Sequence, residues 1–210
     1  FTERWRELIR FLRTDYKELK LGYSANWDRY WKVHFWRPSK PDANDGLDLA
    51  GMTTYYELAG EGEHEPTVEQ IVANWSSYRK KGKDRNYRKE IEQWQRTTGL
   101  PVIFTEVGWY SRKGAAYQPW NYYYNKGKVS MVEQANLYEA FVRIWGDHRA
   151  VGGIFFWDWS TDPGGPKDES YTPRGKSAEK VMRSYFEKFA HPREPESQPD
   201  TQARQSRPDI

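Results

Sequence analysis

The chain has 210 residues, 30% of them charged, a mean hydropathy of −1.05 and a formal net charge of +3. Because no apolar run approaches the roughly 20 residues of a membrane helix, we expect a soluble chain, and the first residues show no signal peptide. The small charge excess argues against nucleic-acid binding, the lack of cysteine excludes disulfides and thiol catalysis, and four scattered histidines predict no metal site.

Aromatic residues are unusually abundant, at 17% of the chain, with 11 Trp and 15 Tyr. A hydrophobic core needs Leu, Ile and Val more than Trp, so part of this excess is expected to line a binding groove. Sugars suit such a groove, because they pair apolar ring faces with hydroxyl rims. The alternative is an aromatic-rich core.

Apolar stripes at helical spacing alternate with short apolar runs along the chain. The predicted helices are residues 2–16, a helix beginning at Thr67, residues 85–98, a helix beginning at Ser130, and residues 177–189. The predicted strands are residues 19–27, 47–58, 101–109 and 151–159. Strands that alternate with helices indicate an α/β fold with a parallel sheet and right-handed crossovers.

Hydroxyl side chains are predicted to cap four of these helices, at Thr2, Thr67, Ser130 and Ser177. Gln70 and Glu133 each follow a cap by three residues and complete two capping boxes. Gly82 is expected to interrupt the helical region between the second and third helices.

Residues 1–189 supply about four strands, whereas a closed barrel of eight strands and eight helices typically needs about 250 residues. We therefore expect residues 1–189 to form one incomplete domain of (β/α)-barrel type. Residues 190–210 are rich in Pro, Gln, Ser and Arg and are expected to be disordered.

One carboxylate stands out in the third predicted strand. An apolar run from Val102 carries Glu106 to its end, and Gly108 then breaks the run. The run predicts a strand buried on both faces of a parallel sheet. An acid at the end of such a strand is costly to bury without partners or a function, and active sites of parallel barrels lie at that end. Glu106 is therefore the first candidate for a catalytic residue.

Several segments, taken in order, resemble glycoside hydrolase family 113. They are Trp5-Arg6-Glu7-Leu8-Ile9, Tyr23-Ser24-Ala25-Asn26-Trp27, Leu47-Asp48-Leu49-Ala50-Gly51-Met52 with Tyr55-Tyr56, Phe104-Thr105-Glu106-Val107-Gly108, Gly114-Ala115-Ala116 with Pro119-Trp120, Phe156-Trp157-Asp158-Trp159, and Tyr171-Thr172-Pro173-Arg174-Gly175-Lys176. The family contains β-mannanase-like members of the retaining TIM-barrel glycosidases.

The resemblance covers residues 1–188 and implies strands five to eight of the barrel, its C-terminal half. The family's general acid/base, in an Asn-Glu pair ending the fourth strand, lies before the helix that opens this chain. The resemblance therefore implies that the acid/base is missing here. Glu3 and Glu7 lie on that opening helix and are not convincing substitutes.

By resemblance, Glu106 is the nucleophile of a retaining glycosidase. Tyr55 or Tyr56 is expected to hydrogen-bond it, with Tyr55 slightly favoured, since adjacent strand residues point in opposite directions. Trp157 or Trp159 would form the floor of the sugar subsite. The further sugar-binding candidates are Asn26, Trp27, Trp109 and Trp120. Each of these residues has an alternative role in packing or in a turn.

Three functions stay open at this stage. The first is half of a retaining β-mannanase-like enzyme that acts on an oligo- or polysaccharide, needs no cofactor and lacks its acid/base. The second is a non-catalytic carbohydrate-binding half-barrel. The third is an interaction protein whose open sheet edges pair with a missing N-terminal half-barrel or with a second copy.

Overall fold

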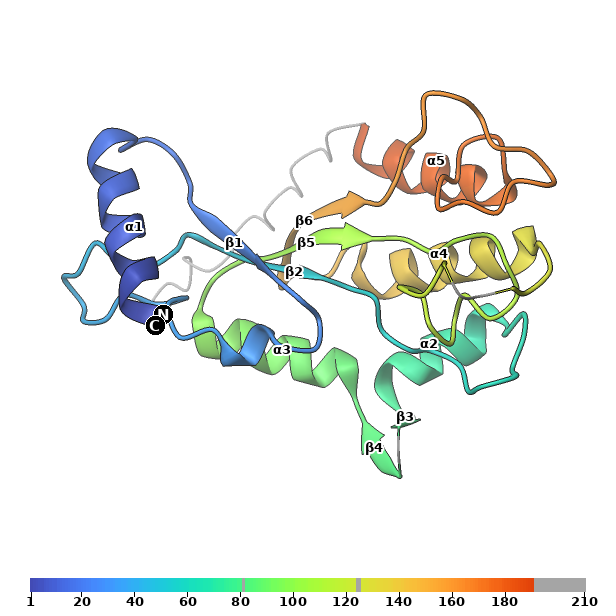
Figure 1. Cartoon of the computed structure of the whole chain (residues 1–210), viewed down its shortest axis with the longest axis horizontal. Helices are drawn as coiled ribbons and strands as arrows, with labels where there is room; N and C mark the ends of the chain where they lie inside the picture. The colour runs from blue at the N-terminus through green and yellow to red at the C-terminus, as the bar shows by residue number, and fades with distance from the viewer. Residues whose placement is uncertain (81, 124–125, 191–210) are drawn as a thin grey trace, which may run out of the picture.

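A sheet of four parallel strands forms the centre of the molecule (Figure 1). The computed structural model describes residues 1–80, 82–123 and 126–190, so nearly all of the predicted disordered tail lies outside the described residues. The strands, in spatial order, are β1 (Gly22–Ala25), β2 (Leu49–Thr53), β5 (Val102–Val107) and β6 (Val151–Phe156). All four predicted strands are present, and each is shorter than its apolar run.

The remaining elements flank this sheet. In chain order they are α1 (Thr2–Asp15), the 3-10 turn η1 (Tyr30–Lys32), α2 (Val68–Ser76), the hairpin strands β3 (Tyr78–Lys80) and β4 (Lys83–Arg85), α3 (Tyr87–Thr98), α4 (Met131–Trp145) and α5 (Ser177–Ala190). Helices thus connect β2 to β5 and β5 to β6, whereas β1 reaches β2 through a segment whose only helical element is η1. Within the described ranges, every helix is too short or too polar to cross a lipid bilayer.

The core lies between one face of the sheet and the helices. Phe104 of β5 is fully buried, and its ring lies 5.5 Å from Phe141 and 5.3 Å from Trp145 of α4. The other face of the sheet is less covered. Ile103 and Thr105 are only half-buried, so the expectation that this strand is buried on both faces is wrong for the described residues.

The open face and the two sheet edges define half of an α/β TIM barrel, as the sequence predicts. Among the described residues, β1 and β6 are the outer strands of this sheet, each paired on one side only. On the open face, the Ser24 and Thr105 hydroxyls of β1 and β5 hydrogen-bond at 2.5 Å, and Phe155 of β6 is 64% exposed. A closed barrel would cover this face with the inner side chains of four more strands.

The helix starts agree only in part with the capping predictions. The Thr67–Gln70 capping box is present. Thr2 lies inside α1, whose N-cap is Phe1 and has no side-chain cap. Ser177 is the first residue of α5, and its hydroxyl donates to the carbonyl of Met131.

The predicted break at Gly82 is instead the antiparallel hairpin β3–β4. Gly82 has a positive φ of 77°, a conformation that glycine adopts without steric cost and that suits a tight turn. Lys80 of this hairpin forms an ion pair with Glu57 at 3.0 Å, and its ammonium lies 5.9 Å from the ring centroid of Trp120. The hairpin therefore braces a loop beyond the strand ends.

A buried ion pair fastens α1 to the loop before β2. Asp45 is 1% exposed and contacts Arg6 at 3.2 Å and Arg10 at 3.1 Å. It also accepts hydrogen bonds from the backbone and hydroxyl of Ser39. Burial opposes ionisation of Asp45, but the Ser39 hydrogen bonds and the two guanidinium groups outweigh it and lower the pKa of this carboxyl.

Candidate active site

A cavity of about 640 Å³ lies at the carboxyl ends of the central strands. Its lining comes from loops after β1, β2, β5 and β6, which is where ligands bind in parallel barrels. The lining residues are Trp27, Tyr55, Glu106, Tyr110, Arg112, Trp120, Tyr122, Trp157, Asp158, Glu169, Ser170 and Tyr171. Five of these were predicted from the sequence, namely Trp27, Tyr55, Glu106, Trp120 and Trp157.

Glu106 is held in this cavity through its backbone as well as its side chain. The backbone N–H and the hydroxyl of Thr54 both donate to the Glu106 carbonyl at 2.9 Å. The phenol of Tyr55 donates to the Glu106 carboxylate at 2.9 Å. Burial, followed by the adjoining Glu106 carboxylate, raises the pKa of Tyr55, so this phenol stays protonated as a hydrogen-bond donor.

The neighbouring Tyr56 points away from the carboxylate. It is 3% exposed, packs its ring 5.3 Å from Trp75 and 4.5 Å from Tyr87, and donates its hydroxyl to the Trp27 carbonyl at 3.4 Å. Tyr55 and Tyr56 thus point in opposite directions, as the alternation of an extended chain predicts. Tyr56 packs beneath the site instead of lining the cavity.

Gly108 brings the ends of β5 and β6 together beside Glu106. A Cβ atom at residue 108 would lie 1.7 Å from the carbonyl oxygen of Trp157, and the Trp157 N–H donates to the Val107 carbonyl at 2.8 Å. Only glycine allows this approach of the two backbones. Trp157, which is 49% exposed and precedes a cis peptide bond to Asp158, therefore reaches the same cavity as Glu106.

Aromatic rings form the walls of the cavity. The Trp27 ring lies 5.3 Å from Trp120 and 5.5 Å from Tyr55. Tyr171 packs edge-on against Tyr55 and Tyr110, and its hydroxyl donates to the carbonyl of Pro119. Burial raises the pKa of Tyr171, which therefore stays neutral. The result is an aromatic surface beside the Glu106 carboxylate.

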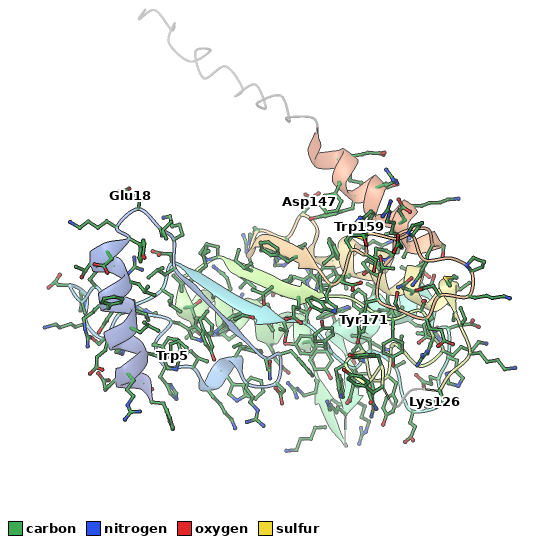
Figure 2. All side chains as sticks on the ribbon, turned by 45° about the horizontal axis from the view of Figure 1, so that its top comes forward. Trp5, Glu18, Lys126, Asp147, Trp159 and Tyr171 are labelled. Carbon is green, nitrogen blue, oxygen red and sulfur yellow. The ribbon has the colours of Figure 1, made fainter. Side chains whose placement is uncertain are left out.

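Three further predicted sugar-binding residues lie outside this cavity. Trp109 is fully buried and packs against Tyr138 and Phe141 of α4, because it points to the same side of the chain as Val107. Trp159 lies against α5, as Figure 2 shows, in a separate depression beside Met182. Asn26 is exposed, and its carbonyl accepts hydrogen bonds from the turn that follows.

Several cavity residues were not predicted. Tyr110 could have been found, because it shares the alternation of Glu106 and Gly108 along the chain. Arg112 and Glu169 form an ion pair at the cavity although they are 57 residues apart, and no local pattern signals such a pair. Asp158 lines the cavity together with its neighbour Trp157, because β6 ends at Phe156 and strand alternation does not extend to these two residues.

A buried carboxylate organises the loop that carries Trp120. Glu133 is fully buried and accepts hydrogen bonds from the backbone N–H groups of Glu65, Gly114 and Ala116 at 2.9, 3.1 and 2.9 Å. Of the second predicted capping box, the hydrogen bond to the Ser130 side chain is present, but the one from the Ser130 N–H to the Glu133 carboxylate is not. Ser130 caps α4, but Glu133 holds two loops and leaves the Ser130 N–H to the carbonyl of Ser111.

Carboxylate chemistry is available in the cavity, since Glu106, Asp158 and Glu169 all line it. Glu169 is engaged by Arg112, whereas the Oδ1 atom of Asp158 is buried with no hydrogen-bond partner among the described residues. Among all residues that the structure describes, no group of three or more His, Asp or Glu residues is placed to hold a metal ion.

The fold and this cavity define half of an α/β TIM barrel with a cavity at the carboxyl ends of its strands. The chain belongs to glycoside hydrolase family 113, whose family model matches residues 2–176. A search of curated proteins found no match.

Solved structures of the same family are similar to this chain. A β-1,4-mannanase of family 113 is 25% identical, with a TM-score of 0.64 over 88% of this chain and 50% of its own. The family 113 β-mannanase of Alicyclobacillus acidocaldarius, in complex with ManMIm, is 26% identical with the same TM-score and coverage. The chain therefore spans about half the length of these mannanases. A β-glucuronidase of Ruminococcus gnavus, 15% identical with a TM-score of 0.52 over 88% of this chain and 29% of its own, shares the fold.

Proposed function

We propose that this chain forms the C-terminal half of the catalytic barrel of a retaining β-mannan hydrolase, with Glu106 as the nucleophile. The observation that carries this proposal is the position of Glu106, a half-buried carboxylate near the end of β5 that accepts a 2.9 Å hydrogen bond from Tyr55 and shares its cavity with Trp157. The substrate class rests on the mannanases to which the chain is similar.

The proposed chemistry follows from these positions. A Glu106 oxygen attacks the anomeric carbon of the sugar, the glycosidic C–O bond breaks, and a glycosyl ester forms. The departing oxygen takes a proton from a general acid, and water then hydrolyses the ester. Tyr55 orients the carboxylate through its hydrogen bond, and the exposed Trp157 ring offers an apolar surface on which the sugar ring stacks.

We place the general acid/base outside this chain, on the fourth strand of the complete barrel. A retaining enzyme needs two carboxyl groups about 5–5.5 Å apart. Glu169, which also lines the cavity, is engaged in an ion pair with Arg112. The isolated chain is therefore expected to bind mannan and to cleave it very slowly, since an alkoxide leaving group needs protonation.

The partner that fits the open sheet is the N-terminal half of such a barrel. Strand β1 offers an unpaired edge with Ser24 exposed, β6 offers the second edge, and Phe155 projects 64% exposed from the face between them. Parallel strands one and four of a barrel would pair with these edges and cover Phe155. Association of two copies is the alternative way to cover the same face.

A non-catalytic carbohydrate-binding half-barrel is the second candidate function. It is favoured by the aromatic walls around Trp27 and Trp120, which can hold a glycan whether or not Glu106 reacts. The two functions differ in whether a covalent bond to Glu106 forms.

The test uses 2,4-dinitrophenyl β-mannoside, whose leaving group needs no acid, with azide as the acceptor. If Glu106 is the nucleophile, the wild-type chain gives β-mannosyl azide by double displacement. The Glu106→Ala variant gives the α-azide, because azide then attacks directly. An α-product from the wild type contradicts the assignment, and no consumption of the mannoside by the wild type favours the binding function.

A further inference from the structure

A second and larger cavity, of about 860 Å³, lies on the outer side of the molecule between the η1 segment and α3. It shares no lining residue with the cavity of Glu106. Figure 1 shows the short η1 turn, drawn in blue, beside α3, and residues of both elements line the cavity. We call this cavity the α3 groove, and the residues that line it include Trp31, Trp36, Trp94, Lys89, Gln93 and Thr97.

The groove exists because one crossover of the half-barrel lacks a regular helix. Strands β2 and β5 are followed by helices that cover the sheet, whereas the chain between β1 and β2 forms only the short η1 and loops. Arg6 of α1 fixes part of this segment by donating to the carbonyl of His34 at 2.8 Å. The space beside α3 therefore stays open, and both of its walls are anchored.

The floor of the α3 groove is a set of rings held in fixed positions. Trp94 lies 5.2 Å from Trp36 and 4.7 Å from Tyr30. The Trp36 indole N–H donates to the Tyr30 carbonyl at 3.1 Å. Above this floor, Trp31 is 49% exposed and touches Tyr30 only by an edge-to-face contact at 5.1 Å. The groove thus offers a flat indole with a free face, at little cost in conformational entropy.

One rim of the groove is polar. Lys89, Gln93 and Thr97 are exposed and follow one another at four-residue intervals, so they form a line along about 12 Å of α3. The cationic Arg85 at the end of the groove is paired with Glu90, with a 2.7 Å hydrogen bond between them. Hydrogen-bonding groups without a strong net charge therefore border the aromatic floor.

This combination selects among possible occupants. A purely apolar ligand would make no hydrogen bond to the exposed polar side chains on α3, of which Gln93 and Thr97 bond within the helix. A strongly anionic ligand would meet Glu90 beside Arg85. A neutral sugar chain suits both the aromatic floor and the polar rim of the groove. Its ring faces stack on indoles, and its hydroxyls hydrogen-bond to amide, hydroxyl and ammonium groups.

We propose that the α3 groove is a second glycan-binding site that holds a stretch of the same neutral β-linked polysaccharide away from the reacting bond. The proposal rests on the proposed function for the identity of the polymer. The two sites are close in the chain, since Trp27 lines the catalytic cavity and Trp31 lines the groove. A long substrate could therefore be held at both sites, while a short one would use only one.

The test is calorimetric titration of the 210-residue chain with mannohexaose, with Trp31→Ala to remove the groove's exposed indole. Trp159→Ala is the matched control, because Trp159 is 52% exposed and lies outside both sites. Trp157→Ala removes the platform of the catalytic cavity. We expect Trp31→Ala to weaken one class of sites roughly tenfold or more, and Trp31→Phe to restore most of the loss.

Trp157→Ala is expected to leave the groove sites intact, and Trp159→Ala to behave as the wild type. The proposal is overturned if Trp31→Ala binds mannohexaose as the wild type does, or if Trp157→Ala abolishes all binding. It is also overturned if Trp31→Ala changes only the oligomeric state, since a protein partner would then occupy the groove. A Trp31-dependent site supports the proposal even when Glu106 proves unreactive, so the two failures are distinguishable.

Discussion

Replacing Gly108 by Ala should cost more stability than any ordinary Gly→Ala change in this chain. The added Cβ would lie 1.7 Å from the Trp157 carbonyl oxygen and 2.8 Å from its carbonyl carbon. Carbon and oxygen atoms rest about 3.3 Å apart even in close contacts, so the ends of β5 and β6 would have to separate by roughly 1.6 Å. Both neighbours are backbone atoms, and no side-chain rotation can relieve the overlap.

The cost can be bounded from the contacts that would be lost. Overpacking that side chains can absorb costs about 1–3 kcal/mol, and here the hydrogen bond from Trp157 to the Val107 carbonyl would break as well. We expect Gly108→Ala to lower the free energy of unfolding by about 3 kcal/mol or more. Because Trp157 and Glu106 would also move apart, sugar binding in the cavity should weaken.

Urea unfolding monitored by circular dichroism measures this difference. Gly165→Ala is the matched control, since a Cβ at Gly165 meets no atom within 4 Å and should change stability by less than about 0.5 kcal/mol. If Gly108→Ala unfolds at the same urea concentration as Gly165→Ala, the close approach of β5 and β6 is wrong. The placement of Trp157 beside Glu106 would then be wrong as well, since it depends on that close approach.

Three further predictions concern single side chains. Glu133→Ala should lower the free energy of unfolding by roughly 3 kcal/mol in the same urea assay, because three backbone N–H groups lose a charged acceptor. The control Glu139→Ala, on the exposed face of α4, should lower it by at most about 0.5 kcal/mol. Since the pKa of Asp45 is lowered on folding, its contribution is present above the unfolded pKa of about 3.9 and is lost as pH falls through the folded value. Asp45→Asn should therefore be less stable than the wild type at pH 7 and nearly equal at the lowest pH where both fold, and an unchanged difference would contradict this. Tyr55→Phe should slow the reaction of Glu106 with an activated mannoside roughly tenfold or more. It should lower the free energy of unfolding by no more than about 1 kcal/mol, because only one hydrogen bond to the carboxylate is removed.

Much of the fold could be predicted from local patterns. The apolar run at Val102–Val107 and the capping box at Thr67 each depend on residues close together in sequence, and both are present in the structure. The hairpin around Gly82 was missed, because a short charged hairpin lacks the apolar alternation by which strands are recognised. The hairpin is held in position by a residue outside it, since Lys80 forms an ion pair with Glu57.

The candidate site divides in a similar way. Glu106 and Trp157 could be found because each lies within the last few residues of a predicted strand. Trp109 has the same sequence context, but α4 covers its side of the sheet and buries it. Helix packing decides which indole is exposed to solvent, and no local sequence pattern predicts that packing. The bonds of Glu133 to two distant loops are tertiary contacts of the same kind.

As the proposed nucleophile, Glu106 forms a covalent bond to the sugar during the reaction. The most direct measurement is peptide mass spectrometry of the chain after reaction with an activated 2-deoxy-2-fluoro-β-mannoside, whose glycosyl ester hydrolyses slowly. We expect one fluoromannosyl group on the peptide containing Glu106 and none in the Glu106→Gln variant. A label on Asp158 or Glu169 instead, or equal labelling of Glu106→Gln, would contradict it.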